Sequence, residues 1–193
     1  MPPSEAELAA HLTRLLDIRL LDPLEILLES DDAVTALRTA VQSRAGDWAQ
    51  RILTGDDTTA LGVTIRLVAT LYPDDGPFAP PVDWWRTPLG QALAWRVGHP
   101  IATSVSYAVA GAMLGITRQG VHDLVTRGKL ARHPDGGVIP ASVRDRLRAR
   151  DGGPAVTPGT RDGGAAAPPG ARNGGPAVPD ATAGGREGRS RHV

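Results

Sequence analysis

The chain contains no cysteine among its 193 residues. This absence excludes disulfide bonds and cysteine-ligated zinc sites, and it is typical of proteins in a reducing cell interior. No apolar run approaches the roughly 20 residues needed to span a bilayer. The first residues, "MPPSEAELAAHL", lack the basic and apolar regions of a signal peptide. We therefore expect a cytoplasmic protein with no membrane partner.

Aromatic residues and lysine are also scarce. Aromatic residues make up 4% of the chain, so aliphatic residues and alanine must fill the core. Lys129 is the single lysine among 21 basic residues. Together with the abundance of alanine, glycine and proline, this preference for arginine is typical of GC-rich coding and indicates a bacterial source.

Motifs that would support catalysis are missing. There is no phosphate-binding G-x-x-x-x-G-K-[ST] loop and no G-x-S-x-G nucleophile turn. Three Asp-Asp pairs fall at breaks or helix starts, where carboxylates favour the helix dipole and the turn. We expect no enzymatic activity, no cofactor and no metal site. The histidines, none at a zinc-ligand spacing, are His11, His99, His122, His133 and His192.

The formal net charge of zero hides an uneven distribution along the chain. Residues 1–99 carry 8 basic and 14 acidic side chains, whereas residues 100–150 carry 8 and 3. Residues 151–193 carry 5 and 4. Such asymmetry is expected when one part of a chain faces a polyanion, although random scatter would also produce it.

These patterns predict a mostly α-helical protein in three parts. Residues 1–99 would form an acidic helical domain, and residues 100–150 a second domain with helices and a small β-hairpin. The tail, residues 151–193, has 11 glycines and 6 prolines in 43 residues and no aromatic side chain. It cannot bury enough apolar surface to offset its chain entropy, so we expect it to be disordered.

Local signals place the helices of the first part. Ser4 and Glu7 have the spacing of a capping box. Apolar residues recur every three or four positions over residues 34–52, which predicts a long helix. Residues 60–72 contain strand-favouring side chains, but their length and setting favour a helix. Thr87, followed by proline, is typical of a helix start.

Tryptophan is concentrated in this aromatic-poor chain. Large aromatic side chains usually anchor a small core, and we favour that interpretation here over a small-molecule pocket or a protein contact. The residues in question are Trp84, Trp85 and Trp95.

Residues 110–128, "AGAMLGITRQGVHDLVTRG", end one helix and begin another within a few residues. Ser106 is a cap for the first helix, and Gly115 is the type of residue that ends one. Thr117 would cap the second helix, residues 117–127, which ends near Gly128. Aliphatic residues lie on one side of this second helix, and polar residues gather on the other side near its start.

This arrangement suits a helix-turn-helix, in which the N-terminal residues of the second helix meet base edges in the DNA major groove. Arginine matches guanine and glutamine matches adenine by paired hydrogen bonds. The helix start itself favours a phosphate. The alternative is an ordinary helical hairpin with a solvated polar face. The candidate DNA-binding residues of this helix are Thr117, Arg118, Gln119 and His122.

The following residues, "GKLARHPDGGVIP", contain Asp-Gly-Gly between two β-prone runs, which predicts a hairpin. Lys129, Arg132 and His133 lie on its first arm, where they could meet the DNA backbone or the minor groove. Ser142 and Asp145 have capping-box spacing before a short basic helix, from which two arginines could reach phosphate.

Residues 103–149 resemble the winged helix-turn-helix of the excisionase-like and MerR-type proteins. The similarity lies in the A-x-x-L-G-I-T-R-x-x-V core, the R-G-K-L that follows, the hairpin with its I-P exit and the helix after it. The resemblance implies major-groove contacts from Arg118, Gln119 and His122, and wing contacts from Lys129, Arg132 and His133. MerR-type regulators carry this unit at their N-terminus before a dimerising helix, whereas here it follows residues 1–99.

We therefore expect a nucleoid-associated, sequence-specific double-stranded-DNA-binding protein that acts as a transcriptional regulator. A homodimer or cooperative protomers on DNA would supply the affinity that a single small module lacks. Residues 1–99 would assemble protomers or contact a protein partner. The alternatives are an architectural factor in recombination and a protein-interaction module that does not bind DNA.

Overall fold

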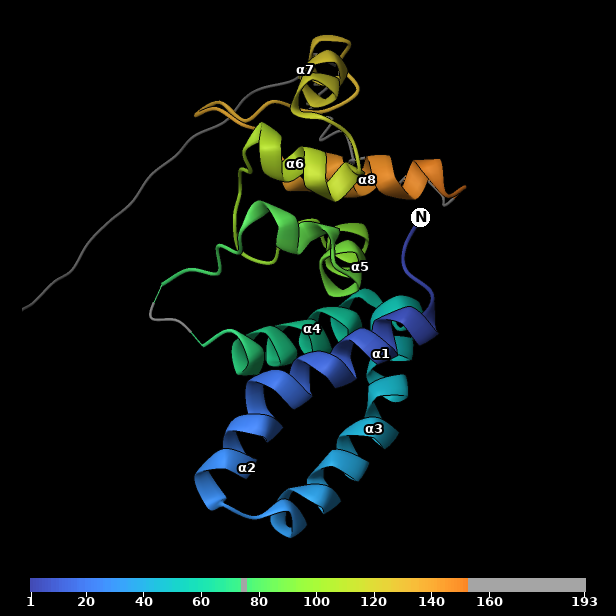
Figure 1. Ribbon diagram of the computed structural model, residues 1–193. Coiled ribbons are helices and arrows are strands. Elements are labelled where there is room, and N and C mark those ends of the chain that lie inside the picture. Colours follow the sequence, from blue (N-terminus) through green and yellow to red (C-terminus); the bar gives the residue numbers. More distant parts are fainter. Residues whose placement is uncertain (74–75, 153–193) are drawn as a thin grey trace, which may run out of the picture. The chain divides into compact units, whose positions relative to one another are not determined.

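The computed structural model describes residues 1–73 and 76–152, and it is mostly helical, as expected (Figure 1). The predicted disorder of the tail falls largely on residues 153–193, which lie outside the described residues. The helices are α1 (Glu5–Leu16), α2 (Asp22–Leu28), α3 (Asp31–Thr54), α4 (Asp57–Leu71), α5 (Pro88–Arg96), α6 (Tyr107–Leu114), α7 (Arg118–Thr126) and α8 (Pro140–Arg150), with a π-helical turn η1 (Asp17–Leu21) and a 3-10 turn η2 (Val82–Arg86).

The first helices begin where the local signals place them. At α1, the Ser4 hydroxyl accepts a hydrogen bond from the Glu7 backbone N–H, and the Glu7 carboxylate accepts one from the Ser4 N–H at 2.8 Å, so the predicted capping box is present. The long helix expected over residues 34–52 is α3, and residues 60–72 fall in α4 apart from the last, as the helical interpretation requires. The Asp56 carboxylate caps α4.

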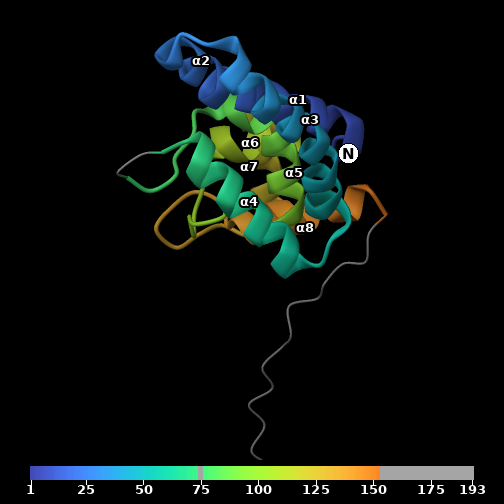
Figure 2. The ribbon, with the colours of Figure 1, turned by 90° about the horizontal axis from the view of Figure 1, so that it is seen from below.

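Helix α5 is the central element of the arrangement. It contacts α1, α3 and α4 on one side and η2, α6 and α8 on others, and it lies in the middle of both views (Figures 1 and 2). The Thr87 hydroxyl accepts a hydrogen bond from the Gly90 N–H and caps α5. Its side chains Leu89, Ala92 and Leu93 are fully buried because helices cover α5 on several sides.

The tryptophans next to α5 belong to the core, as predicted for Trp84 and Trp85. Both are buried in η2, and their rings pack edge to face at 5.0 Å between centroids. The His99 ring lies 5.1 Å from Trp85, and burial lowers the pKa of His99, which favours the neutral ring. Its Nδ1 then accepts a hydrogen bond from the Ala102 N–H at 2.9 Å. Trp95 is only partly buried.

Residues on both sides of the predicted boundary near residue 100 share one cluster of buried side chains. Arg148 of α8 donates hydrogen bonds to the carbonyl oxygens of Trp95 and Arg96 at the end of α5, at 3.3 and 2.9 Å, and lies 3.4 Å from an Asp57 oxygen. Gly98, with φ +85°, leaves room for the Pro140 carbonyl. These contacts fix α8 against α5, while the division into two domains stays a prediction.

The expected β-hairpin is reduced to isolated bridges, and none of the residues described by the structure forms a strand. Val138 pairs with Arg132 and also with Val105, exchanging two backbone hydrogen bonds of 3.0 and 2.9 Å with Val105. The His133 N–H also donates to the Gly137 carbonyl at 3.2 Å, and the Ile139 N–H to the Ala131 carbonyl at 2.9 Å. The pairing goes no further because Pro134, Gly136 and Gly137 form the turn on one side and α8 begins at Pro140 on the other. The finer prediction of a winged domain with a hairpin is therefore not established by this geometry.

The capping box predicted from Ser142 and Asp145 is wrong. Helix α8 begins at Pro140, after Ile139, which has no capping side chain. The Ser142 hydroxyl instead accepts a hydrogen bond from the Ala131 N–H at 3.1 Å and donates one to the Ile139 carbonyl. Proline supplies the helix start because it needs no N–H partner in the first turn.

Within residues 1–73 and 76–152, none of the helices combines the length and the apolar character that crossing a membrane would require.

Candidate functional site

Helices α6 and α7 meet at a tight corner. The Ser106 hydroxyl caps α6, and Gly115, with φ +66°, ends it. The Ile116 N–H then donates to the Gly111 carbonyl at 2.9 Å, which closes the turn. Gly111 is required here, because a Cβ at this position would lie 2.9 Å from the Ile116 carbonyl oxygen. The Thr117 hydroxyl accepts from the Gly120 N–H at 3.1 Å and starts α7.

Helix α7 is amphipathic, as its sequence pattern indicates. Val121 is fully buried, and Leu124 and Val125 pack partly against the core. The polar residues face away from this contact, so the side chains predicted to read DNA are accessible. The exposed positions on α7 and its cap are Thr117, Arg118, Gln119, His122, Asp123 and Thr126.

The structure brings together three of the predicted side chains from two separate segments. Arg118 and His122 of α7 and Arg132 of the segment after it line one open groove of about 620 Å³. The Tyr107 ring, at the start of α6, lies edge-on to His122 at 6.3 Å between centroids and belongs to the same groove. The groove thus has two guanidinium groups and an exposed imidazole along its sides.

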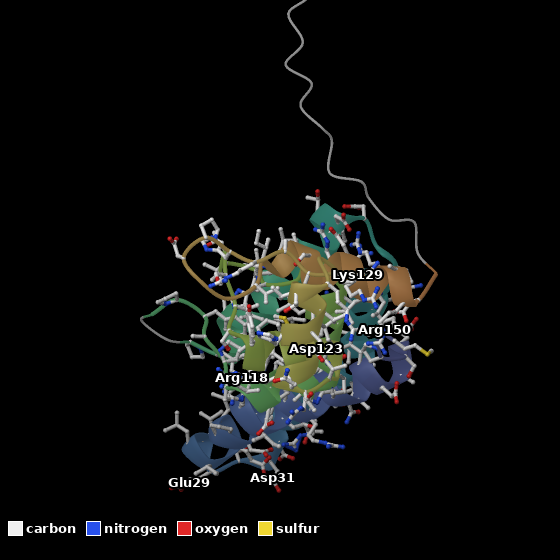
Figure 3. All side chains as sticks on the ribbon, turned by 90° about the horizontal axis from the view of Figure 1, so that it is seen from above. Glu29, Asp31, Arg118, Asp123, Lys129 and Arg150 are labelled. Carbon is white, nitrogen blue, oxygen red and sulfur yellow. The ribbon has the colours of Figure 1, made fainter. Side chains whose placement is uncertain are left out.

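Other predicted residues lie apart from this groove. Lys129 is exposed beyond the end of α7, far from Arg118 in the view onto that helix (Figure 3). The His133 side chain is 20% exposed, and its Nδ1 accepts a hydrogen bond from the Asp135 N–H at 3.2 Å. The Gln119 side chain donates to Asp123 at 3.2 Å. His133 therefore lies in a local turn rather than beside Arg118.

The charges in this region are largely unneutralised. Among the described residues, the arginine ion pairs of this region involve Arg144 with Asp145 and Arg148 with Asp57. The His122 and His133 rings each lie near a neighbouring carboxylate, at 3.9 and 3.8 Å. None of these pairs includes the half-buried Arg146 or the exposed cations Arg118, Arg127, Lys129 and Arg132. The surface formed by α7, the segment after it and α8 is therefore basic, which suits an anionic ligand.

Sequence reasoning did not single out Arg127 and Tyr107, although both contribute to this surface. Arg127 follows Ile116, Gly120 and Asp123 at steps of three and four, which would place it on one flank of α7. Tyr107 carries no comparable signal, because its position beside His122 depends on how α6 packs against α7.

In the part of the chain that the structure describes, no group of three or more His, Cys, Asp or Glu side chains is placed to hold a metal ion.

No protein-family model, curated protein or solved structure is significantly similar to this chain.

Proposed function

We propose that this chain is a sequence-specific double-stranded-DNA-binding protein, a transcriptional regulator that reads the major groove with α7. The observation that carries the proposal is the corner between α6 and α7, which leaves the polar start of α7 exposed. The groove shared by Arg118, His122 and Arg132 adds base-reading and phosphate-binding groups beside it.

The resemblance to the excisionase-like and MerR-type winged helix-turn-helix supports the same proposal. In that comparison, the segment of residues 128–139 takes the place of the wing, with Arg132 and Lys129 as its backbone contacts. The basic surface formed by α7, the segment after it and α8 agrees with a protein that binds an anionic polymer. Association with the nucleoid would follow from DNA binding.

Arg118→Ala and Lys129→Ala test the roles of these side chains. Arg118→Ala should weaken binding to a preferred duplex by about 10- to 100-fold, and random duplexes less, because a base contact contributes about 1–3 kcal/mol to discrimination. Lys129→Ala should weaken both alike, because it would meet only the backbone. Mobility shifts on genomic and random fragments, at 50 and 200 mM salt, measure both effects.

Two results would count against the proposal. Wild-type affinity that stays constant between 50 and 200 mM salt would exclude phosphate contacts altogether. Equal losses for the two variants on both kinds of duplex would contradict the division between base and backbone contacts. If the protein is instead an architectural factor, it should bind and bend preferred and random duplexes with similar affinity.

A second function is favoured by the apolar surface of α2 and its neighbours, which we call the tip. Ile26 and Leu27 are 78% and 77% exposed, and Glu29, at the end of α2, has φ +48°. Exposed apolar groups of this kind mark contact surfaces. The large apolar side chains that η1, α2 and α3 leave exposed are Ile18, Leu20, Ile26, Leu27, Leu28 and Leu37.

We propose that the tip joins protomers, which gives a DNA-bound assembly more contacts than one module makes. Leu27→Glu should then convert an assembled wild-type protein to monomers, as measured by sedimentation velocity at micromolar concentration. Ile65→Glu, at an exposed apolar residue of α4, is the control and should leave the assembly unchanged. Assembly through the tip would be contradicted if the wild-type protein is monomeric both in free solution and when bound to DNA.

A further inference from the structure

A second hollow lies along the other flank of α7, between α7 and α8. Its volume is about 340 Å³, and Gly120, Arg127, Arg146 and Arg150 line it. Ile116, Gly120, Asp123 and Arg127 follow one another at helical spacing, whereas Arg118 and His122 line the groove on the opposite flank. Helix α7 therefore has arginines along both flanks, and Gln119 and Thr126 lie on the ridge between them.

The hollow concentrates positive charge from two helices. Arg127 comes from the end of α7 and Arg146 from α8, and neither takes part in an ion pair among the described residues. Arg150 donates to the Leu114 carbonyl at 3.0 Å, which fixes its guanidinium at the edge of the hollow. Figure 3 shows Arg150 to one side of α7, with Arg118 near the start of the helix. One carboxylate, from Asp123, also borders the hollow.

Gly120 is an independent indication that a ligand approaches this flank of α7 closely. Glycine is the poorest helix former after proline, so an interior glycine needs a reason. Packing does not supply one, because the atoms nearest to a Cβ at this position would be the Ile116 Cδ1 at 3.4 Å and the Thr117 hydroxyl at 3.5 Å, which are ordinary contact distances. Without a side chain, however, the backbone of α7 stays open to a ligand in the hollow.

We propose that the hollow between α7 and α8 binds a phosphodiester group of the DNA backbone. The proposal rests on the proposed function and deepens it. A helix with its side chains is about 10–12 Å across and the major groove is about 12 Å wide, so both DNA backbones lie close to an inserted helix. Arg132 in the groove then meets the backbone of one strand, while Arg118 reaches the base edges. The hollow at Arg127, Arg146 and Arg150 meets the backbone of the other strand.

This geometry also explains how a carboxylate, that of Asp123, is compatible with DNA binding by α7. Asp123 lies at the edge of the hollow that is nearest to Gln119 on the ridge, so its carboxylate can face base edges rather than the phosphate. There it can accept a hydrogen bond from the amino group of cytosine. Gln119, whose amide donates to Asp123 at 3.2 Å, holds that carboxylate in position. An acidic residue on the reading helix is therefore compatible with phosphate contacts on both sides of it.

Arg146→Ala in the full chain tests the hollow directly. Binding to a preferred duplex should weaken about 5- to 20-fold at 100 mM salt, and the slope of log affinity against log salt should fall by about one. Arg66→Ala removes the same charge from an exposed position of α4 and should stay within about twofold of wild type. Replacing single phosphates by methylphosphonates should show one position that weakens wild-type binding but no longer affects the Arg146→Ala variant.

Gly120→Ala provides a second variant, which we expect to stay folded. It should keep or raise the melting temperature, because alanine favours the helix and fits without a close contact. DNA affinity should nevertheless fall about 10-fold, because the new methyl group narrows the hollow.

Different results would contradict the phosphate site in the hollow and DNA binding by the protein as a whole. An unchanged salt slope in Arg146→Ala and an unchanged affinity in Gly120→Ala, with the Arg118→Ala loss of specificity intact, would overturn the hollow alone. Absence of salt-dependent DNA binding in the wild type would overturn the function itself. A third result would also contradict the inference. If 10 mM inorganic phosphate raises the melting temperature only when Arg146 is present, but Arg146→Ala does not change the salt dependence of DNA binding, the hollow binds free phosphate and not the DNA backbone.

Discussion

Replacing Trp85 by alanine is expected to lower the free energy of unfolding by about 3–5 kcal/mol, the usual cost of deleting a large core aromatic. The side chain is 1% exposed. It packs against Trp84 and His99, and η2 lies against both α5 and α6. The substitution therefore leaves a cavity where the N-terminal helices meet the helix that supports α7.

The same substitution tests whether residues 1–99 and 100–150 unfold independently. Because one buried cluster includes residues from both segments, we expect a single transition in urea, with circular dichroism and tryptophan fluorescence coinciding. Trp48→Ala, at a partly buried position of α3, is the control and should cost less. Two separate transitions would indicate independent domains. A Trp85→Ala loss no larger than that of the control would contradict the placement of Trp85 at the centre of the core.

Sequence reasoning succeeded where the determining interactions are local. The caps at Ser4, Thr87, Ser106 and Thr117 each join residues three positions apart, so a short stretch of sequence contains both partners. The buried face of α7 was also predictable, because helical periodicity places Val121 and its neighbours on one side.

It failed where partners are far apart in the chain. Ser142 has capping-box spacing, yet its hydroxyl serves Ala131, eleven residues earlier. Arg148 belongs to the basic helix from which two arginines were expected to reach phosphate, but it bonds to carbonyl oxygens of α5 more than fifty residues away. The site shows the same division. The exposure of Arg118 and His122 followed from the pattern of α7, whereas the approach of Arg132 depends on the pairing of Val138 with Val105.

That pairing brings Gly137 close to Ser104 and Val105, so a side chain at this position would disturb the placement of Arg132. The φ of Gly137 is +79°, and a Cβ there would lie 2.5 Å from both the Ser104 hydroxyl and the Val105 carbonyl oxygen. Gly137→Ala should therefore lower the free energy of unfolding by about 3 kcal/mol, because a positive φ costs about 1–2 kcal/mol for alanine and the close contact adds about 1–3 kcal/mol.

The neighbouring Gly136 offers a matched control. Its φ is +102°, but a Cβ there has nothing within 4 Å, so Gly136→Ala should show the conformational cost alone, about 1 kcal/mol. Urea unfolding of both variants gives the difference. Under conditions in which both are fully folded, Gly137→Ala should also lower DNA affinity more than Gly136→Ala, because only the first disrupts the bond between Val138 and Val105 and so displaces Arg132 from Arg118 and His122. Equal losses of stability and affinity in the two variants would mean that the contact with Val105 does not position Arg132.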